Sequence, residues 1–238
     1  MKIKHIADVF SSIQGEGLFV GEYQVFIRFA ECNLKCPYCD TQNLTSKTIS
    51  LKKLIKKVKL LSDNGNLCNT VSITGGEPLL HVEYLKDLFL ALKTLKYKVY
   101  LETNGALPLN LKKIIKFVDY ISMDIKLPTS SGLDRPLWKE HHLFLRTADK
   151  HLKRKDKKSL FVKIVITKLL KFNEFKKAVR IIAKINKNIP LVIQPVTPSG
   201  SVKERVNIKT IIKLLEIARK ELKDVLVIPQ VHKILGVK

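Results

Sequence analysis

Short runs of apolar and β-branched residues recur along the chain, separated by segments with a different period. Each run is about the length of a strand that is buried on both faces of a parallel sheet. The runs occupy residues 24–30, 70–74, 97–103, 120–126, 160–166, 191–196 and 225–231. The pattern therefore predicts strands at these seven places.

Between the runs, apolar residues recur with the spacing of an amphipathic helix. Helices are expected at residues 51–62, 82–95, 109–117, 172–187 and 203–222, with a further one around 137–150. Strands that alternate with helices are typical of right-handed βα units, so the fold class is α/β with a mainly parallel sheet. An open doubly wound sheet and an incomplete barrel both fit this order of elements.

The 238-residue chain shows no internal repeat and no low-complexity linker. We therefore expect one compact domain over residues 1–238, with 128–159 as a candidate variable insertion. Apolar residues, 45% of the total, lie in short runs, which argues against a transmembrane span. The first residues lack the apolar core and cleavage site of a signal peptide, so a cytoplasmic location is expected.

Lysine and arginine number 44 against 21 aspartate and glutamate residues, giving a net charge of +23. Such a balance could reflect a nucleic-acid partner or an anionic substrate. Most of the lysines, however, are scattered along amphipathic segments such as residues 51–61. We interpret the charge as compositional bias and the dense run at 150–158 as a solvated loop or helix end, so direct nucleic-acid binding is not expected.

Three cysteines follow the first predicted strand, in the segment ECNLKCPYCDT. Cys32, Cys36 and Cys39 are spaced C-x3-C-x2-C, and so short a loop can present each thiolate to a different iron of a [4Fe–4S] cluster. The fourth iron then has no protein ligand. An open metal position of this kind can bind a small molecule.

Structural zinc and unpaired thiols are the alternatives to a cluster. Structural zinc sites have four protein ligands, usually as two close pairs. The other candidate ligands are distant in the sequence: Cys68, His5, His81 and His232. The odd triplet and the expected compartment also disfavour a disulfide scaffold. The ligand count therefore favours the cluster.

Two motifs together resemble the radical S-adenosylmethionine superfamily. One is the cysteine triplet with Tyr38 directly before its third member, and the other is TGGEP at residues 74–78, after a predicted strand. A longer set resembles one family within it, the 7-carboxy-7-deazaguanine synthases, over about residues 8–235. This set comprises SSIQGEG before the cysteines, CDT at the third cysteine, and then ETNG, DIKLPTSSG, QPVTP and PQVHK.

The superfamily resemblance implies a partial (β/α) barrel rather than a doubly wound sheet. The motifs IRFAECN, ITGGEP, LETNG, MDIK, IQPVTP and IPQVH all fall at the carboxyl ends of predicted strands. Loops at these ends converge on one mouth in a parallel barrel, so we expect the motifs to form one site.

The family resemblance implies a lyase whose cofactors are a [4Fe–4S] cluster, S-adenosylmethionine and Mg²⁺. One electron from the cluster cleaves S-adenosylmethionine, and the resulting radical abstracts hydrogen from 6-carboxy-5,6,7,8-tetrahydropterin. Ring contraction and loss of ammonia then give 7-carboxy-7-deazaguanine, a precursor of queuosine or archaeosine in tRNA. The resemblance also implies a homodimer and a reducing partner such as flavodoxin or ferredoxin.

Matching the family motifs residue by residue assigns the cluster to Cys32, Cys36 and Cys39, and Mg²⁺ to Thr41. Expected contacts to S-adenosylmethionine are Tyr38, Cys39, Asp40, Gly76, Ser122, Asp124, Lys126, Gln194 and Pro195. Expected contacts to the substrate are Ile13, Gln14, Gly15, Glu16, Arg28, Thr74 and His232. Glu102 and Asn104 are second-tier candidates.

Some of these residues also have a physical interpretation. Glu16 offers a carboxylate that can accept paired N–H bonds from the guanidine-like edge of a pterin, although acidic residues in glycine-flanked turns are often only surface charges. Arg28 lies inside an apolar strand and needs an anionic or polar partner, for which the substrate is favoured over a structural ion pair. A substrate carboxylate would favour protonated His232, whereas an isolated histidine there would more often be a satisfied core residue.

Two other classes of function remain open. An activating enzyme that forms a glycyl radical on a partner protein, or another radical enzyme, would share the cysteines, but IQGEG and QPVTP argue against it. A non-catalytic iron–sulfur or tRNA-binding protein would not account for the TGGEP motif or for the iron without a protein ligand.

Overall fold

A single nine-stranded sheet forms the centre of the computed structural model, which describes residues 2–41, 44–152, 159–198 and 201–237. The sheet order is β3-β1-β2-β4-β5-β6-β7-β8-β9. The strands are β1 (Lys2–Ile13), β2 (Tyr23–Phe29), β3 (Lys47–Ser50), β4 (Thr70–Gly75), β5 (Lys98–Thr103), β6 (Tyr120–Asp124), β7 (Leu160–Ile166), β8 (Leu191–Pro195) and β9 (Val225–Val227). A strand is present at each of the seven predicted places, and β1 and β3 are additional. The run predicted at 225–231 is a strand only over Val225–Val227, and Val231 begins a short helix.

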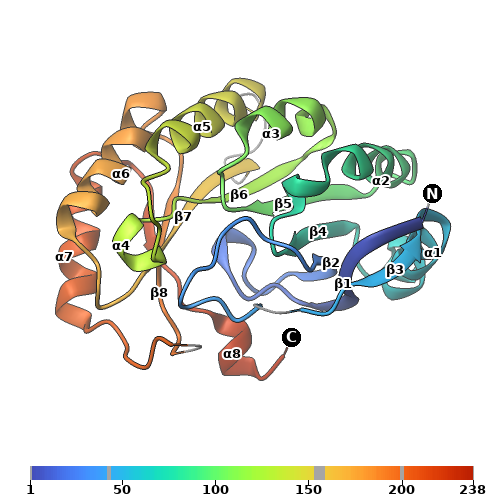
Figure 1. Ribbon diagram of the computed structural model, residues 1–238, viewed down its shortest axis with the longest axis horizontal. Coiled ribbons are helices and arrows are strands. Elements are labelled where there is room, and N and C mark those ends of the chain that lie inside the picture. The colour runs from blue at the N-terminus through green and yellow to red at the C-terminus, as the bar shows by residue number, and fades with distance from the viewer. Residues whose placement is uncertain (1, 42–43, 153–158, 199–200, 238) are drawn as a thin grey trace.

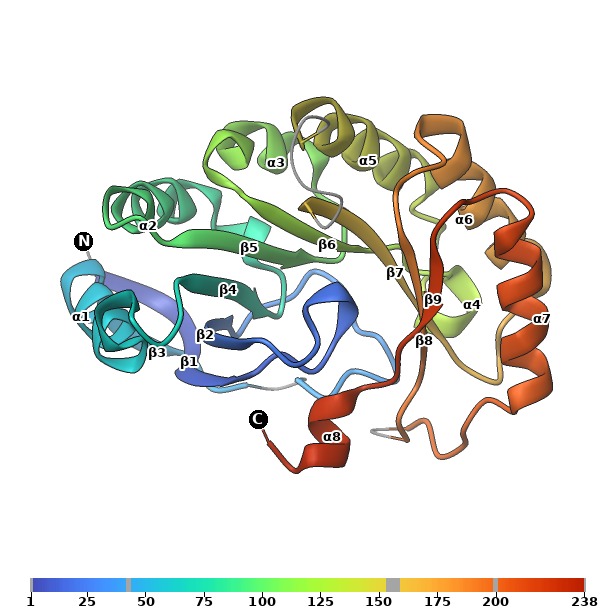
Figure 2. The same cartoon turned by 180° about the vertical axis from the view of Figure 1, so that it is seen from behind.

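The sheet is mainly parallel, as predicted. Strands β2 and β4 to β9 pair in parallel, in the order in which they occur along the chain. The two additional strands are antiparallel, β1 to β2 and β3 to β1, and they extend one edge. The result is an open, curved sheet with β3 and β9 at its edges, which confirms the partial barrel (Figures 1 and 2).

Helices cover the outer face of this curved sheet (Figure 1). They are α1 (Leu51–Leu61), α2 (Val82–Thr94), α3 (Pro108–Ile114), α5 (Trp138–Leu152), α6 (Phe172–Ile185) and α7 (Ile208–Arg219). Two short helices lie elsewhere, α4 (Pro128–Ser131) beside the cysteine loop and α8 (Val231–Leu235) beside Gly15. Short 3-10 turns lie at η1 (Gly17–Phe19), η2 (Asp63–Gly65), η3 (Pro78–His81) and η4 (Ile115–Phe117). The predicted helix at 203–222 begins later than expected because Asn207 caps α7, its side chain accepting from Thr210 N at 2.8 Å.

Two apolar clusters hold the fold together. The larger lies between the sheet and the helices, where residues such as Ile73, Leu101 and Phe175 are fully buried. The smaller lies inside the curve of the sheet, where Phe19 from η1 packs against Tyr100, with ring centroids 4.9 Å apart, and against Phe161. The segment after β1 therefore folds under the sheet and fills its base with aromatic side chains.

Residues 128–152 form the connection between β6 and β7. Helix α5 in this segment packs against α3 and α6 and buries Phe144 and Leu145, so it belongs to the helical layer. Whether 128–159 varies among relatives stays a prediction. Of the charged run at 150–158, residues 153–158 lie outside the described residues.

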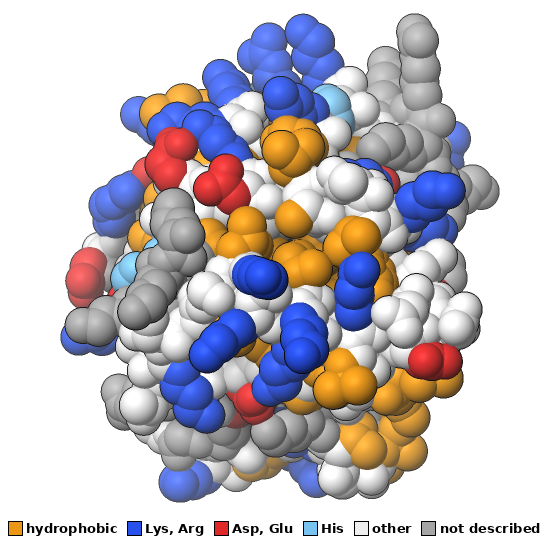
Figure 3. All heavy atoms as spheres, turned by 90° about the vertical axis from the view of Figure 1, so that its right-hand side faces the viewer, with side chains coloured by type: hydrophobic (Ala, Val, Ile, Leu, Met, Phe, Trp, Pro, Cys, Tyr) orange, Lys and Arg blue, Asp and Glu red, His pale blue; other side chains and the backbone are white. Residues whose placement is uncertain are grey.

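Positive side chains are widely spread over the surface. On the face that Figure 3 presents, lysine and arginine side chains are scattered among uncharged and hydrophobic ones rather than joined in one stripe. In the described part of the chain, no helix combines the length and the apolar character needed to cross a bilayer.

Candidate active site

A cavity of about 560 Å³ lies inside the curved sheet and gathers most of the residues singled out from the sequence. Strand register sets its walls: Arg28 is paired with Thr74, and Asp124 with Lys163. The predicted residues that line it are Ile13, Gln14, Gly15, Glu16, Arg28, Cys32, Cys36, Tyr38, Cys39, Asp40, Thr41, Thr74, Gly76, Asp124, Lys126, Gln194 and His232, with Glu102 and Asn104. Ser122 and Pro195 do not line it; Ser122 is buried within β6 and bonds to Tyr100.

The cysteine loop borders one side of this cavity. Cys36 is buried, Cys39 is half-buried and Cys32 is exposed, and no disulfide joins any two of the three. Among the described residues they do not form a group whose ligand atoms all lie within 4.8 Å. Sulfurs bound to one zinc at about 2.3 Å would lie roughly 3.8 Å apart, whereas a cubane takes each sulfur on a different iron. The donor set and its spacing therefore fit a [4Fe–4S] cluster better than a single ion.

Several contacts fix the conformation of this loop. Leu34 N donates to Cys32 Sγ at 3.4 Å, and Cys39 Sγ lies 3.3 Å from Thr41 Oγ1. Cys68, in contrast, packs against the main core and does not line the cavity. The sequence distinction between the triplet and the lone cysteine thus corresponds to two different environments.

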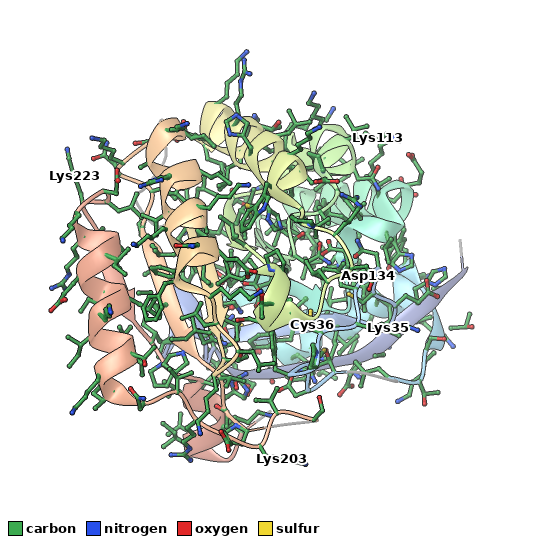
Figure 4. The ribbon with its side chains drawn as sticks, turned by 60° about the vertical axis from the view of Figure 1, so that its left-hand side comes forward. Lys35, Cys36, Lys113, Asp134, Lys203 and Lys223 are labelled. Carbon is green, nitrogen blue, oxygen red and sulfur yellow. The ribbon has the colours of Figure 1, made fainter. Side chains whose placement is uncertain are left out.

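Tyr38 anchors the loop to the neighbouring helix. Its hydroxyl lies 2.9 Å from Ser131 Oγ in α4, and Figure 4 shows Cys36 beside this helix. Burial raises the pKa of Tyr38 to about 12. The Lys126 ammonium lies 5.6 Å from the centre of the tyrosine ring, a cation–π distance. The tyrosine is therefore neutral and held in place at neutral pH.

Gly76 lets the cysteine loop lie against the turn after β4. A Cβ atom at this position would be 1.9 Å from Glu31 O, the carbonyl that also accepts from Glu77 N at 2.7 Å. The Glu77 carboxylate is buried and accepts hydrogen bonds from Thr103 Oγ1 and Asn104 N at 2.9 and 2.8 Å. Burial raises the pKa of Glu77 to about 7 despite these donors.

A buried charge network occupies the centre of the cavity. The Lys163 ammonium contacts Glu16 and lies 3.4 Å from Asp124, whose other oxygen is 2.6 Å from Lys126 Nζ. Burial would raise the pKa of Glu16, but Lys163 and the Gln230 amide, 2.8 Å away, lower it to about 2. Glu16 is therefore an ionised carboxylate that lines the cavity. It is not the surface charge that a glycine-flanked turn often carries.

Lys163 is the principal cavity residue that the sequence interpretation missed. It stands alone among apolar residues in the run 160–166, as Arg28 does in 24–30, and the reasoning used for Arg28 would have found it. Burial lowers the pKa of Lys163, but Asp124 and Glu16 outweigh that effect and raise it. Its charge is thus kept at any physiological pH.

Glu102 forms a second polar centre, together with Gln14. Its carboxylate accepts from Ser72 Oγ at 2.6 Å, from Gln14 Nε2 at 3.0 Å and from Thr74 Oγ1 at 3.3 Å. Burial raises the pKa of Glu102, with Lys163 opposing. These bonds fix the side chain of Gln14 before any ligand arrives.

Two buried polar atoms facing this site lack partners among the described residues: Arg28 Nε and Gln194 Oε1. No carboxylate in the described part of the chain pairs with Arg28, whose Cζ lies 4.9 Å from the centre of the Phe10 ring. An unpartnered buried donor or acceptor is costly, so both atoms indicate that a polar ligand completes the site.

Gly15 and His232 bring distant parts of the chain together. Val231 N donates to Gly15 O at 2.9 Å, and a Cβ atom on Gly15 would lie 2.4 Å from His232 Nδ1. Burial lowers the pKa of His232, while the nearby Glu16 carboxylate opposes the shift. Helix α8 therefore closes one side of the cavity and depends on the absence of a side chain at residue 15.

Comparison with known proteins agrees with this site. The family model described as Radical SAM superfamily matches residues 26–207. A 7-carboxy-7-deazaguanine synthase of Geobacter sulfurreducens is 37% identical, over 97% of this chain and 96% of the relative. One from Methanothermobacter thermautotrophicus is 34% identical, over 98% of this chain and 97% of the relative.

A solved structure shares the fold. The crystal structure of QueE from Escherichia coli aligns with a TM-score of 0.60 and 19% identity, covering 98% of this chain and 95% of that one. At this identity the likeness concerns the fold alone. The family match and the full-length relatives together establish that the chain belongs to the radical SAM superfamily and, within it, to the 7-carboxy-7-deazaguanine synthase family.

Proposed function

We propose that this chain converts 6-carboxy-5,6,7,8-tetrahydropterin into 7-carboxy-7-deazaguanine. The observation that carries the proposal is one cavity that joins the cluster cysteines to Glu16 and Arg28. Relatives above 30% identity over nearly their full length bear the name of this synthase. The product would supply the biosynthesis of 7-deazapurine nucleosides such as queuosine or archaeosine.

The cofactors supply the difficult chemistry, and the protein supplies position and charge. When bound, a [4Fe–4S] cluster with S-adenosylmethionine provides one-electron cleavage and hydrogen abstraction. Cys32, Cys36 and Cys39 would hold the cluster. The proposed contacts to S-adenosylmethionine are Tyr38, Cys39, Asp40, Gly76, Asp124, Lys126 and Gln194. Ser122 and Pro195, on the same strands as Asp124 and Gln194, stay predicted contacts although they do not line the cavity.

On the substrate side, Glu16 is ionised and has one oxygen bonded to Gln230 and the other to Lys163. Each carboxylate oxygen can accept more than one hydrogen bond, so Glu16 could also accept N–H groups from the pterin. Arg28, whose buried Nε lacks a partner among the described residues, suits the substrate carboxylate, because a guanidinium binds a carboxylate with paired bonds. Ile13, Gln14, Gly15, Thr74 and His232 would complete the substrate pocket.

Thr41 is the proposed protein contact of Mg²⁺. Its hydroxyl is half-buried in the cavity wall, beside Cys39. A hydroxyl is a weak ligand by itself, but Mg²⁺ commonly keeps several waters and takes further oxygens from the substrate. The ion would therefore link substrate oxygens to the loop that carries the cluster.

We further propose that the enzyme is a cytoplasmic homodimer that receives electrons from flavodoxin or ferredoxin. The support is family resemblance together with the cofactor's need for a reductant. Direct nucleic-acid binding is not part of the proposal. Sedimentation of the reconstituted protein tests the dimer, and reduction of the cluster by each donor tests the electron source.

The decisive test is anaerobic reconstitution with iron and sulfide, followed by reductant, S-adenosylmethionine, Mg²⁺ and the carboxytetrahydropterin. The expected products are 7-carboxy-7-deazaguanine and ammonia in equal amounts, with 5′-deoxyadenosine as the sign of S-adenosylmethionine cleavage. Loss of ammonia from this substrate is redox-neutral, so the abstracted hydrogen atom is returned and 5′-deoxyadenosine need not match the deazapurine. Formation of 5′-deoxyadenosine without the deazapurine would retain the radical chemistry and reject the substrate. A protein that cleaves no S-adenosylmethionine with an intact cluster would reject the activity altogether.

A further inference from the structure

Three side chains outside the cavity lie close together, and one of them belongs to Glu31, the residue directly before Cys32. His5 on β1, Glu31 after β2 and His81 at the end of η3 each offer one ligand atom, and these atoms all lie within 4.8 Å of one another. His5 Nδ1 is 2.8 Å from Glu31 Oε1, and His81 Nε2 is 3.7 Å from Glu31 Oε2. None of the three lines the cavity.

His81 provides an independent observation that points to a ligand. Its side chain is only 8% exposed, and its Nε2 atom is buried without a hydrogen-bond partner among the described residues. The ring is stacked between Phe29 and His5, with centroids 5.3 and 4.1 Å away. A buried nitrogen left without a partner is costly, so this side chain is held in an orientation that a ligand would satisfy.

The spacing of one pair also suits a shared ion. The 3.7 Å between His81 Nε2 and Glu31 Oε2 is too long for a hydrogen bond. Two ligand atoms bonded to one zinc at about 2.0–2.2 Å in a tetrahedron lie roughly 3.3–3.5 Å apart, so a small movement brings this pair into range. The His5 ring, stacked on His81 at 4.1 Å, has to turn out of the stack to point a nitrogen at the same ion. A plain His5–Glu31 ion pair would explain the shorter contact but would leave His81 without a partner.

We propose that His5, Glu31 and His81 bind a divalent transition-metal ion of the zinc type, separate from the cluster. Two imidazoles and a carboxylate are a ligand set typical of such ions, whereas Mg²⁺ and Ca²⁺ prefer oxygen ligands alone. The Glu31 side chain is 53% exposed, so water can reach the ion and fill the remaining position. The proposal does not depend on the substrate proposed above.

The ion would join three segments at the base of the cysteine loop. Backbone bonds already connect them, from Ala30 N to His5 O at 2.9 Å and from Glu77 N to Glu31 O at 2.7 Å. A metal bond to each side chain would add a second connection between β1, the residue before Cys32 and η3. We therefore assign the ion a structural role, holding the start of the cluster loop against the turn that contains Gly76.

The test uses untagged, cluster-loaded protein titrated anaerobically with Co²⁺, whose absorption reports its ligands. We expect one Co²⁺ per chain beyond the cluster iron, without a thiolate-to-cobalt charge-transfer band. His5→Gln and His81→Gln should each weaken binding by more than the roughly 10–100-fold that loss of an outer-shell partner costs. His5 is 37% exposed, so its replacement should leave the fold intact, and His142→Gln on the exposed side of α5 is the matched control.

Thermal unfolding gives a second readout that requires no activity. Zn²⁺ should raise the unfolding temperature of the wild type and of His142→Gln, but not of His5→Gln, because an ion that binds only the folded state stabilises it. Iron content should stay equal in all variants. Absence of Co²⁺ binding at millimolar concentration, a thiolate-to-cobalt band, or equal affinity in His5→Gln and the wild type would each overturn the proposal.

Discussion

The ammonium of Lys163, on β7, donates a hydrogen bond to the carboxylate of Glu16, 147 residues earlier in the chain, inside the curve of the sheet. The same ammonium lies 3.4 Å from Asp124, so one cation serves two carboxylates. Removing one member of a buried pair leaves the other charge uncompensated. Much of the electrostatics of the cavity therefore depends on this lysine.

Lys163→Met should destabilise the protein by about 3–5 kcal/mol, because Glu16 and Asp124 would remain buried without their shared cation. The free energy of urea unfolding measures the loss. Lys168→Met replaces an exposed lysine that pairs with Glu204 at the surface, and it should cost about 1 kcal/mol or less. Equal unfolding midpoints in the two variants would contradict the role assigned to Lys163.

Cys36→Ala should prevent stable assembly of the cluster and abolish cleavage of S-adenosylmethionine, because a cubane held by two thiolates loses a third of its protein ligands. Iron content and 5′-deoxyadenosine formation after anaerobic reconstitution are the measurements. Cys68→Ala is the control, since that thiol packs against the core away from the cavity. Full iron loading in Cys36→Ala would exclude the proposed ligand set.

Gly76→Ala should raise the KM for S-adenosylmethionine about tenfold or more, a loss of about 1.4 kcal/mol, because the new Cβ would displace the carbonyl of Glu31. Gly21→Ala gives the comparison. A Cβ atom at residue 21 would meet no atom within 4 Å, so this substitution introduces only the strain of the positive φ. Unchanged KM values in Gly76→Ala would show that the close approach of the loop is dispensable.

Arg28→Lys should raise the KM for the carboxypterin by roughly 10–100-fold, because an ammonium cannot reproduce the paired bonds of a guanidinium to a carboxylate. Binding of S-adenosylmethionine should be little affected. Arg180→Lys, at an exposed position on α6, is the matched control. A larger effect on S-adenosylmethionine than on the pterin would reassign Arg28 to the cofactor side.

His141 should make the protein less stable as the pH falls. Burial lowers its pKa from 6.5 to about 4, while its Nε2 lies 3.1 Å from Asn104 O. Between these two values the unfolded state binds the additional proton, so stability falls as the pH drops through 6.5 towards 4. The loss from this group between about pH 7 and pH 5 is about 2 kcal/mol.

His141→Gln keeps a donor for Asn104 O but does not titrate. The variant should therefore show a smaller loss of unfolding free energy over the same pH interval than the wild type. His142→Gln, the exposed neighbour, should retain the wild-type dependence. Identical pH dependence in all three proteins would mean that folding does not lower the pKa of His141.

The sequence predicted those parts of the fold that have a strong local signal. Strands such as 160–166 are apolar except for Lys163, because helices cover one face and the smaller aromatic cluster lies against the other, so the run is plain in the sequence. β1 was missed because it mixes charged and apolar residues and is paired with the short edge strand β3 only over Lys2–Ile6, and β3 because it spans only Lys47–Ser50 and is partly exposed. Edge strands have weaker patterns since only part of each is buried.

The site was predictable wherever a motif stood at the end of a strand. The cysteines, Gly76 and Asp124 line the cavity because parallel strands bring their carboxyl ends together. The ion pair between Lys163 and Glu16, and the stacking of His5 on His81, depend on how the sheet curves and on where β1 lies. A single sequence carries no local signal for such contacts.

The contact between Gly15 and α8 has a consequence for synthesis of the chain. Each parallel strand can pair with its predecessor as it leaves the ribosome, so the sheet can grow from β4 onwards in order. The neighbours that Glu16 and Gly15 receive from Gln230 and His232 arrive only after β9, with α8 and the residue before it. A nascent chain would thus acquire its cysteine loop well before a competent substrate pocket, and cofactor assembly could precede the first opportunity for turnover.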